Sequence, residues 1–343
     1  MRVSLKLFSA LVCVLCGLCG LGGTNSSSVA SSTSTLRTEP IEAQQRKELI
    51  VFNAGSLTAP FADLLKEFAL LHPDVTPQQE SSGSLDLVRK ITELGKPCDV
   101  LAVADYEVIP SLLIPRHAEW YGIFARNQMV LIYTPSSKFA GEINSKTWHE
   151  ILLRPGVQSG HSDPDADPAG YRTLLLWQLA EKYYQKPGLY EQLNKTVPPR
   201  NIRPKSVELV ALLQTGELDY IYGYRSVAEQ SGLSYVTLPP EIDLSDSSKE
   251  DLYSTVSTQV AGNKPGEKKT IKGLPILFAL TIPKIAPHQQ LAEEFIGFAS
   301  SAEGQEIMKR SHLTLVSPAL ASDLEKVPMG LRPNFVSLEK RRK

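Results

Sequence analysis

Short apolar strands alternate with amphipathic helices along most of this 343-residue chain. The apolar run 49–52 is followed by Phe61, Leu64, Leu65 and Phe68 at helical spacing, behind Thr58 as the expected cap. Similar pairs of elements recur to about residue 311, without an internal repeat. This order predicts an α/β fold in which helices pack on mostly parallel strands.

The composition favours a globular protein with a sizeable core. The hydrophobic content is 42% and the formal charge is −1, which allows two domains or one two-lobed domain. A nucleic-acid partner is disfavoured, because 36 Lys and Arg residues are balanced by 37 Asp and Glu residues. The one basic cluster, 340–343, is interpreted as a solvated tail.

The N-terminus is typical of an export signal. Residues 1–23 combine a positively charged start with an apolar run and small residues, and the Ser/Thr-rich stretch 24–47 is a linker. Cys19 is a candidate lipid anchor, with ordinary secretion as the alternative. We therefore expect a protein in the periplasm or at the outer face of the cytoplasmic membrane. Cys98 is the one cysteine beyond the signal, so disulfides do not hold the fold together.

The spacing of the candidate residues disfavours several kinds of metal and catalytic site. The six histidines form no i, i+4 pair, which disfavours zinc. Asp163, Asp165 and Asp167 mimic the start of a calcium loop, but Pro168 occupies its glycine position and Leu174 its bidentate glutamate position. No P-loop or nucleophile elbow is present. A divalent-cation binder and an exported enzyme that uses the three acids for acid–base chemistry remain alternatives.

Small neutral donors stand at three strand-to-helix turns, in segments 53–56, 81–84 and 162–172. Each turn allows backbone N–H and hydroxyl groups to point at one guest, although each serine alone also fits a simple helix cap. The third turn adds carboxylates beside the free amides. That combination suits a cation, or an oxyanion whose central atom can accept an oxygen ligand.

Longer motifs follow one another in a specific order. They include Asn53-Ala54-Gly55-Ser56-Leu57, Ser82-Gly83-Ser84, Val88-Arg89-Lys90, Ala104-Asp105-Tyr106, Phe124-Ala125-Arg126-Asn127, Asp167-Pro168-Ala169-Gly170-Tyr171-Arg172 and Tyr224-Arg225-Ser226-Val227-Ala228. In this order they resemble the tungstate/molybdate-binding proteins of ABC importers, in particular the branch first known from archaea. The resemblance runs from about residue 49 to about residue 318.

The resemblance implies a type II periplasmic-binding fold, in which two α/β lobes joined by crossing hinge strands close on an oxyanion in the cleft between them. Lobe I is expected at 48–132 and 237–325, lobe II at 133–236 and a basic tail at 326–343. It also implies a monomeric binding protein that works with a membrane permease and needs neither catalysis nor a cofactor. Phosphate or sulfate is the alternative ligand.

The resemblance further implies the ligand-binding residues, which are Gly55, Ser56, Ser84, Asp167, Ala169, Ser206 and Tyr224. Asp167 would approach the molybdenum or tungsten centre, and Ala169 would contribute its backbone amide. Family members with a six-coordinate metal have a glutamate at the position of Ser206. Glu208 lies two residues on, and because two helical steps turn a side chain by about 200° it should face away. Six-coordination is therefore not expected.

Overall fold

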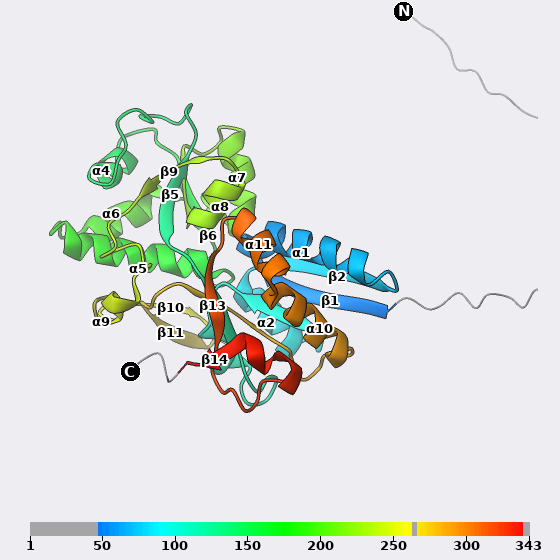
Figure 1. Cartoon of the computed structure of the whole chain (residues 1–343). Helices are drawn as coiled ribbons and strands as arrows, with labels where there is room; N and C mark the ends of the chain where they lie inside the picture. The colour runs from blue at the N-terminus through cyan, green and yellow to red at the C-terminus, as the bar shows by residue number, and fades with distance from the viewer. Residues whose placement is uncertain (1–46, 263–265, 339–343) are drawn as a thin grey trace, which may run out of the picture. The chain divides into compact units, whose positions relative to one another are not determined.

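The computed structural model describes residues 47–262 and 266–338, which belong to one compact unit. The predicted signal 1–23, the candidate anchor Cys19 and the basic cluster 340–343 lie outside the described residues. The predicted linker 24–47 also lies outside them, except for Lys47, which is the first residue of a strand. The described part consists mainly of two sheets with helices around them (Figure 1).

The larger sheet has seven strands in the order β14-β13-β4-β12-β3-β1-β2. Strand β1 is parallel to both of its neighbours, β2 and β3, as expected for strands joined by helical crossovers. Apolar residues fill both faces of its central strands, which explains their continuous apolar runs. The strands are β1 (Lys47–Ala54), β2 (Val75–Ser82), β3 (Val100–Val103), β4 (Gly122–Arg126), β12 (Leu277–Thr281), β13 (Thr314–Ala321) and β14 (Phe335–Ser337).

The smaller sheet has five strands in the order β7-β6-β8-β5-β9. The middle strand is parallel to one neighbour and antiparallel to the other. The strands are β5 (Met129–Tyr133), β6 (Ser159–Ser162), β7 (Ile202–Arg203), β8 (Tyr220–Tyr224) and β9 (Ser234–Thr237).

The chain crosses between the two sheets at two places. Asn127 and Gln128 join β4 to β5, and the segment after β9 returns the chain to β12. The expected lobe boundary at residue 132 needs correction, because β5 pairs wholly within the smaller sheet.

The expectation of mostly parallel strands is only partly met, because the strands β12 and β5 are antiparallel to their partners. We attribute this to the crossings, which let a strand enter a sheet against its neighbours.

Helices flank both sheets, and Figure 1 shows α1 running alongside β1 and β2. The α-helices are α1 (Thr58–Leu71), α2 (Ser84–Thr92), α3 (Val108–Leu112), α4 (Trp148–Leu152), α5 (Pro168–Tyr183), α6 (Leu189–Thr196), α7 (Ser206–Gln214), α8 (Arg225–Gln230), α9 (Glu250–Tyr253), α10 (Gln289–Ser300) and α11 (Ala302–Arg310). Short 3-10 turns are η1 (Gly55–Leu57), η2 (Pro199–Asn201), η3 (Ser247–Lys249) and η4 (Met329–Asn334).

Two further segments complete the fold. A separate hairpin, β10 (Ser257–Ala261) and β11 (Lys268–Lys272), contacts α5. The tail predicted at 326–343 is wrong in part, because η4 precedes β14, which pairs in parallel with β13. The physical reason is the apolar pair Phe335 and Leu331, whose buried side chains tie this segment to the core.

The core beneath α1 and α10 is aromatic. The ring of Phe68 meets the ring of Phe295 edge-on at a centroid separation of 5.4 Å, and Phe61 lies 6.2 Å from Phe295. Burial of these side chains fixes the helices against the larger sheet. The N-termini of the helices are thereby placed at the carboxyl ends of the strands, where the polar turns predicted from the sequence lie.

Candidate functional site

Four polar turns from the two lobes meet at one place. A Cβ added to Gly83 would lie 2.0 Å from the carbonyl oxygen of Ala166, so the turn before α2 touches the turn before α5. A Cβ added to Gly55 would lie 3.5 Å from Cβ of Lys205, so η1 lies against the start of α7. A hydrogen bond from the Ser206 N–H at the start of α7 to Asp167 at the start of α5 joins these two pairs of turns. Three α-helix N-termini and one 3-10 turn therefore meet in a common region, where the positive ends of the helix dipoles favour an anion.

Asp167 is the acid at this convergence. Its Oδ1 accepts the N–H of Ala169 at 3.1 Å, which makes it the N-cap of α5, and its Oδ2 accepts the N–H of Ser206 at 3.0 Å. The residue is 3% exposed. Burial raises the pKa of the Asp167 carboxyl, and the two backbone hydrogen bonds oppose that rise. The Ala169 amide predicted to hold a ligand is thus already a donor to Asp167.

The turns that converge here also hold buried serine hydroxyls. The hydroxyls of Ser56 and Ser206 are buried and have no hydrogen-bond partner among the described residues. Ser84 is buried as well, and its hydroxyl accepts the N–H of Ala104 at 3.0 Å, which leaves its proton to be donated elsewhere. Buried hydroxyls without partners are costly, so they indicate a place where a ligand supplies the acceptors.

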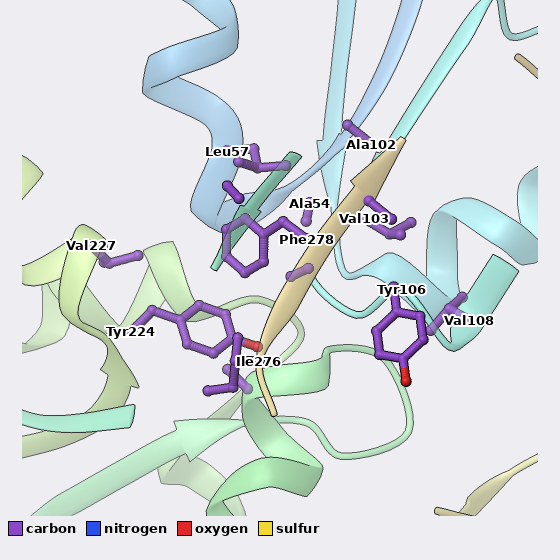
Figure 2. Packing of buried hydrophobic residues seen from close by; sticks show 14 of the residues in the cluster. Ala54, Leu57, Ala102, Val103, Tyr106, Val108, Tyr224, Val227, Ile276 and Phe278 are labelled. Atoms are coloured by element: carbon purple, nitrogen blue, oxygen red, sulfur yellow. The ribbon is translucent and has the colours of Figure 1, made fainter. Parts of the chain in front are cut away.

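Tyr224 approaches the same region from the end of β8. Its ring packs at 5.6 Å from the ring of Phe278 in β12, and Figure 2 shows the two rings beside each other. Its hydroxyl accepts a hydrogen bond from Arg172 at 2.6 Å. Burial raises the pKa of Tyr224, and the Arg172 charge opposes this rise. The hydroxyl is therefore protonated at neutral pH and able to donate.

The other two acids of the Asp-Pro segment have separate tasks. Asp163 accepts the N–H of Asp165 at 2.9 Å within the turn. Asp165 accepts the N–H of Ala261 from the β10 strand at 2.6 Å. Arg89 in α2 donates to the carbonyl oxygens of both Asp165 and Ala261, at 3.0 and 3.2 Å. Asp165 and Arg89 thus tie the Asp-Pro turn to the hairpin and to α2, whereas the Asp163 bond stabilises the turn itself.

Glu208 lies outside the site, as its position in α7 predicts. The helix begins at Ser206, and the Glu208 carboxylate pairs with Lys205 at 3.8 Å with 38% of its side chain exposed. Among the residues that the structure describes, no group of three His, Cys, Asp or Glu side chains could hold a metal ion. A second carboxylate for a bound metal is therefore not provided by α7.

The structure brings all seven predicted residues to this region through four turns and one strand end. Sequence reasoning assigned no role to a buried layer behind them, made of Arg172, Ala104 and Asp105. Arg172 donates to the Ala104 carbonyl oxygen at 2.6 Å and lies 3.4 Å from the Asp105 carboxylate. The available signal was a lone arginine in the otherwise uncharged first half of α5. A charge at such a position requires a buried partner.

Comparison with known proteins identifies the class. Residues 49–314 match the family described as bacterial extracellular solute-binding protein, and the chain belongs to that family. An uncharacterized solute-binding protein from Petrotoga mobilis (strain DSM 10674 / SJ95) is 47% identical over 285 residues, which cover 83% of this chain and 89% of that protein. The molybdate/tungstate-binding protein WtpA of Pyrococcus abyssi (strain GE5 / Orsay) is 42% identical over 304 residues, covering 81% and 87%.

A solved structure confirms the fold. The periplasmic molybdate-binding protein of Azotobacter vinelandii has a TM-score of 0.58 and 16% identity, over 78% of this chain and 99% of that protein. The predicted type II periplasmic-binding fold with two α/β lobes is thus confirmed. The family description agrees with the predicted export. Within residues 47–262 and 266–338, no helix combines the length and apolarity that a membrane span requires.

Proposed function

We propose that this chain captures molybdate or tungstate outside the cytoplasm and delivers it to an ABC importer. The observation that carries the proposal is the pair of buried hydroxyls of Ser56 and Ser206, which have no partner among the described residues. The Ser206 amide bonds the capped acid Asp167, and the turn that holds Ser56 lies against the start of the Ser206 helix. The 42% identity to a protein named for molybdate and tungstate binding supports the choice of ligand.

The donor set fits a tetrahedral oxyanion. Ser56, Ser84 and Tyr224 would donate to its oxygens, and the helix N-termini add partial positive charge without a counter-ion. Neutral, preorganised donors replace the water shell of the anion at a small cost in reorganisation. We propose that the Ala169 amide is shared between Asp167 and an anion oxygen, as three-centre bonds at helix ends often are.

Asp167 supplies the selectivity in this proposal. Its remaining lone pairs would face the molybdenum or tungsten centre, which can accept a further oxygen ligand. The sulfur of sulfate accepts no such ligand, so the same carboxylate repels sulfate. The proposed protein carries out no chemistry and needs no cofactor. It acts as a monomer whose closed lobes present a surface to the membrane permease. Lipid attachment at Cys19 stays a prediction.

Equilibrium calorimetry on the purified mature chain tests the proposal. We expect tight binding of tungstate and molybdate, with sulfate, phosphate and calcium each at least about a hundredfold weaker, a difference of about 3 kcal/mol. A matched variant, Ser56→Ala, should weaken tungstate without altering the far-UV spectrum. Equal affinity for all the anions would indicate a general oxyanion site, and calcium binding alone would refute the proposal.

A further inference from the structure

The buried residue Arg172 connects two proposed ligand donors that come from different lobes. One terminal nitrogen donates to the Tyr224 hydroxyl and to the Ala104 carbonyl oxygen, both at 2.6 Å. The amide of Ala104 in turn donates to the Ser84 hydroxyl at 3.0 Å. Arg172 is 2% exposed, and the Asp105 carboxylate 3.4 Å away balances the charge of its guanidinium group. A continuous chain of hydrogen bonds therefore links Tyr224 in the smaller sheet to Ser84 beside the larger one.

The direction of every bond in this chain is fixed. Arginine has five N–H donors and no acceptor, and it stays charged in proteins. The Tyr224 oxygen must therefore accept from Arg172, and its own proton must point to another group. Among the described residues, no group accepts that proton. Ser84 is in the same position, because its oxygen accepts an amide N–H.

We propose that Arg172 is a positioning and specificity-determining residue, which forces Tyr224 directly and Ser84 through Ala104 to act as donors toward the ligand. The inference rests on the proposed function. A site whose hydroxyl protons are directed at the ligand favours anions that only accept hydrogen bonds. Molybdate and tungstate carry no proton at neutral pH, whereas phosphate retains one. The phosphate proton needs an acceptor. Arg172 and the Ala104 amide already occupy one of the two acceptor positions on the Tyr224 and Ser84 oxygens, which makes both oxygens poorer acceptors for that proton.

Two other pockets of the molecule offer weaker grounds for a ligand site. In the polar pocket between Arg126, Arg225 and His312, Arg225 is already paired with Glu229 at 2.7 Å, and His312 lies 3.6 Å from the same carboxylate. The apolar cavity beside Phe61 and Met308 contains nothing that specifies a guest. The Arg172 chain has four partners with defined donor and acceptor roles.

The test is a double-mutant cycle of Arg172→Gln with Tyr224→Phe, read by the Kd of molybdate and of phosphate. A glutamine oxygen can accept the Tyr224 proton, so Arg172→Gln should weaken molybdate about tenfold to a hundredfold and phosphate less. In the Tyr224→Phe background the same change should cost molybdate little more, because its main route of action is already gone. The control variant Tyr171→Phe removes the hydrogen bond from the Tyr171 hydroxyl to Asp105. It should leave the ratio of the molybdate Kd to the phosphate Kd unchanged.

The outcomes distinguish a failure of the proposed function from a failure of the inference about Arg172. If the wild-type chain binds neither molybdate nor tungstate, the proposed function fails and the inference fails with it. If the wild type prefers molybdate, and Arg172→Gln keeps the Kd ratio or adds its full cost to Tyr224→Phe, the inference alone is refuted. Should Arg172→Gln not fold, Arg172→Gln combined with Asp105→Asn removes the buried charge left behind, and the same change in ratio is expected.

Discussion

The Asp167 carboxylate accepts the backbone N–H of Ser206 over 3.0 Å, so one buried acid joins the N-terminus of α5 to the N-terminus of α7. This contact places the acid at the position where a ligand would meet both helix ends. It also means that Ser206 is part of the site through its amide, while its hydroxyl stays without a partner among the described residues. The role of each of these two residues can be tested separately.

Asp167→Ala should weaken tungstate binding and relax the rejection of sulfate, because it removes both the metal-directed oxygen and the repelling charge. Loss of the N-cap should also lower the free energy of unfolding by about 1 kcal/mol. Calorimetric titration with both anions measures the ranking, and Asp163→Ala and Asp165→Ala are the controls. If either control changes the ranking and Asp167→Ala does not, the selective acid is a different one.

The resemblance places Ser206 where relatives with a six-coordinate metal would have a glutamate. We therefore predict that a bound metal has fewer than two carboxylate ligands from the protein. Four- or five-coordination is then expected for bound tungstate, and Ser206→Glu should add a ligand and sharpen the preference over sulfate. X-ray absorption spectroscopy of the two complexes measures the coordination number. A six-coordinate metal in the wild-type complex would show that another acid takes this role.

Gly83→Ala should hinder closure of the cleft. The backbone of Gly83 has φ −62° and ψ 144°, which alanine adopts without strain, but the new Cβ would meet the Ala166 carbonyl oxygen at 2.0 Å. The clash lies between the lobes, so tungstate affinity should fall about tenfold or more while the melting temperature without ligand changes little. Gly141→Ala is the control, since no atom lies within 4 Å of its added Cβ. Unchanged affinity in Gly83→Ala would mean that the lobes do not approach here.

Asp243 gives a pH dependence of stability. Burial raises the pKa of its carboxyl from 3.8 to about 6. The folded chain therefore holds a proton that the unfolded chain releases, so this contribution is full below about pH 4 and is lost as pH rises through about 6. The loss is about 3 kcal/mol at most. Urea unfolding of wild type and Asp243→Asn at several pH values measures it, and the variant should lack this fall. Parallel curves would contradict the raised pKa.

The turns of the site were predictable because their signals are local. Gly55 and Ser56 follow a strand directly, and Asp167 precedes Pro168 at a helix start, so residue type alone indicates free N–H groups and a cap. The fold class followed from the alternation of elements, and its two-lobed form from the resemblance.

The remaining features depend on tertiary contacts. Arg172 meets Ala104 and Tyr224 at separations of 68 and 52 residues, which no local pattern encodes. The crossing at Asn127 was missed because the apolar strand that follows, β5, looks the same in either sheet. The short strand β14 gains its stability from pairing with β13, so its sequence alone resembles a tail.

The most direct test of the central claim is a crystal structure of the mature chain with tungstate, located by the anomalous scattering of tungsten. The account predicts one strong peak enclosed by Ser56, Ser84, Asp167 and Tyr224, with an Asp167 oxygen directed at the metal and Arg172 still bonded to the Tyr224 hydroxyl. A peak elsewhere on the protein, or none in a crystal grown with excess tungstate, would contradict it.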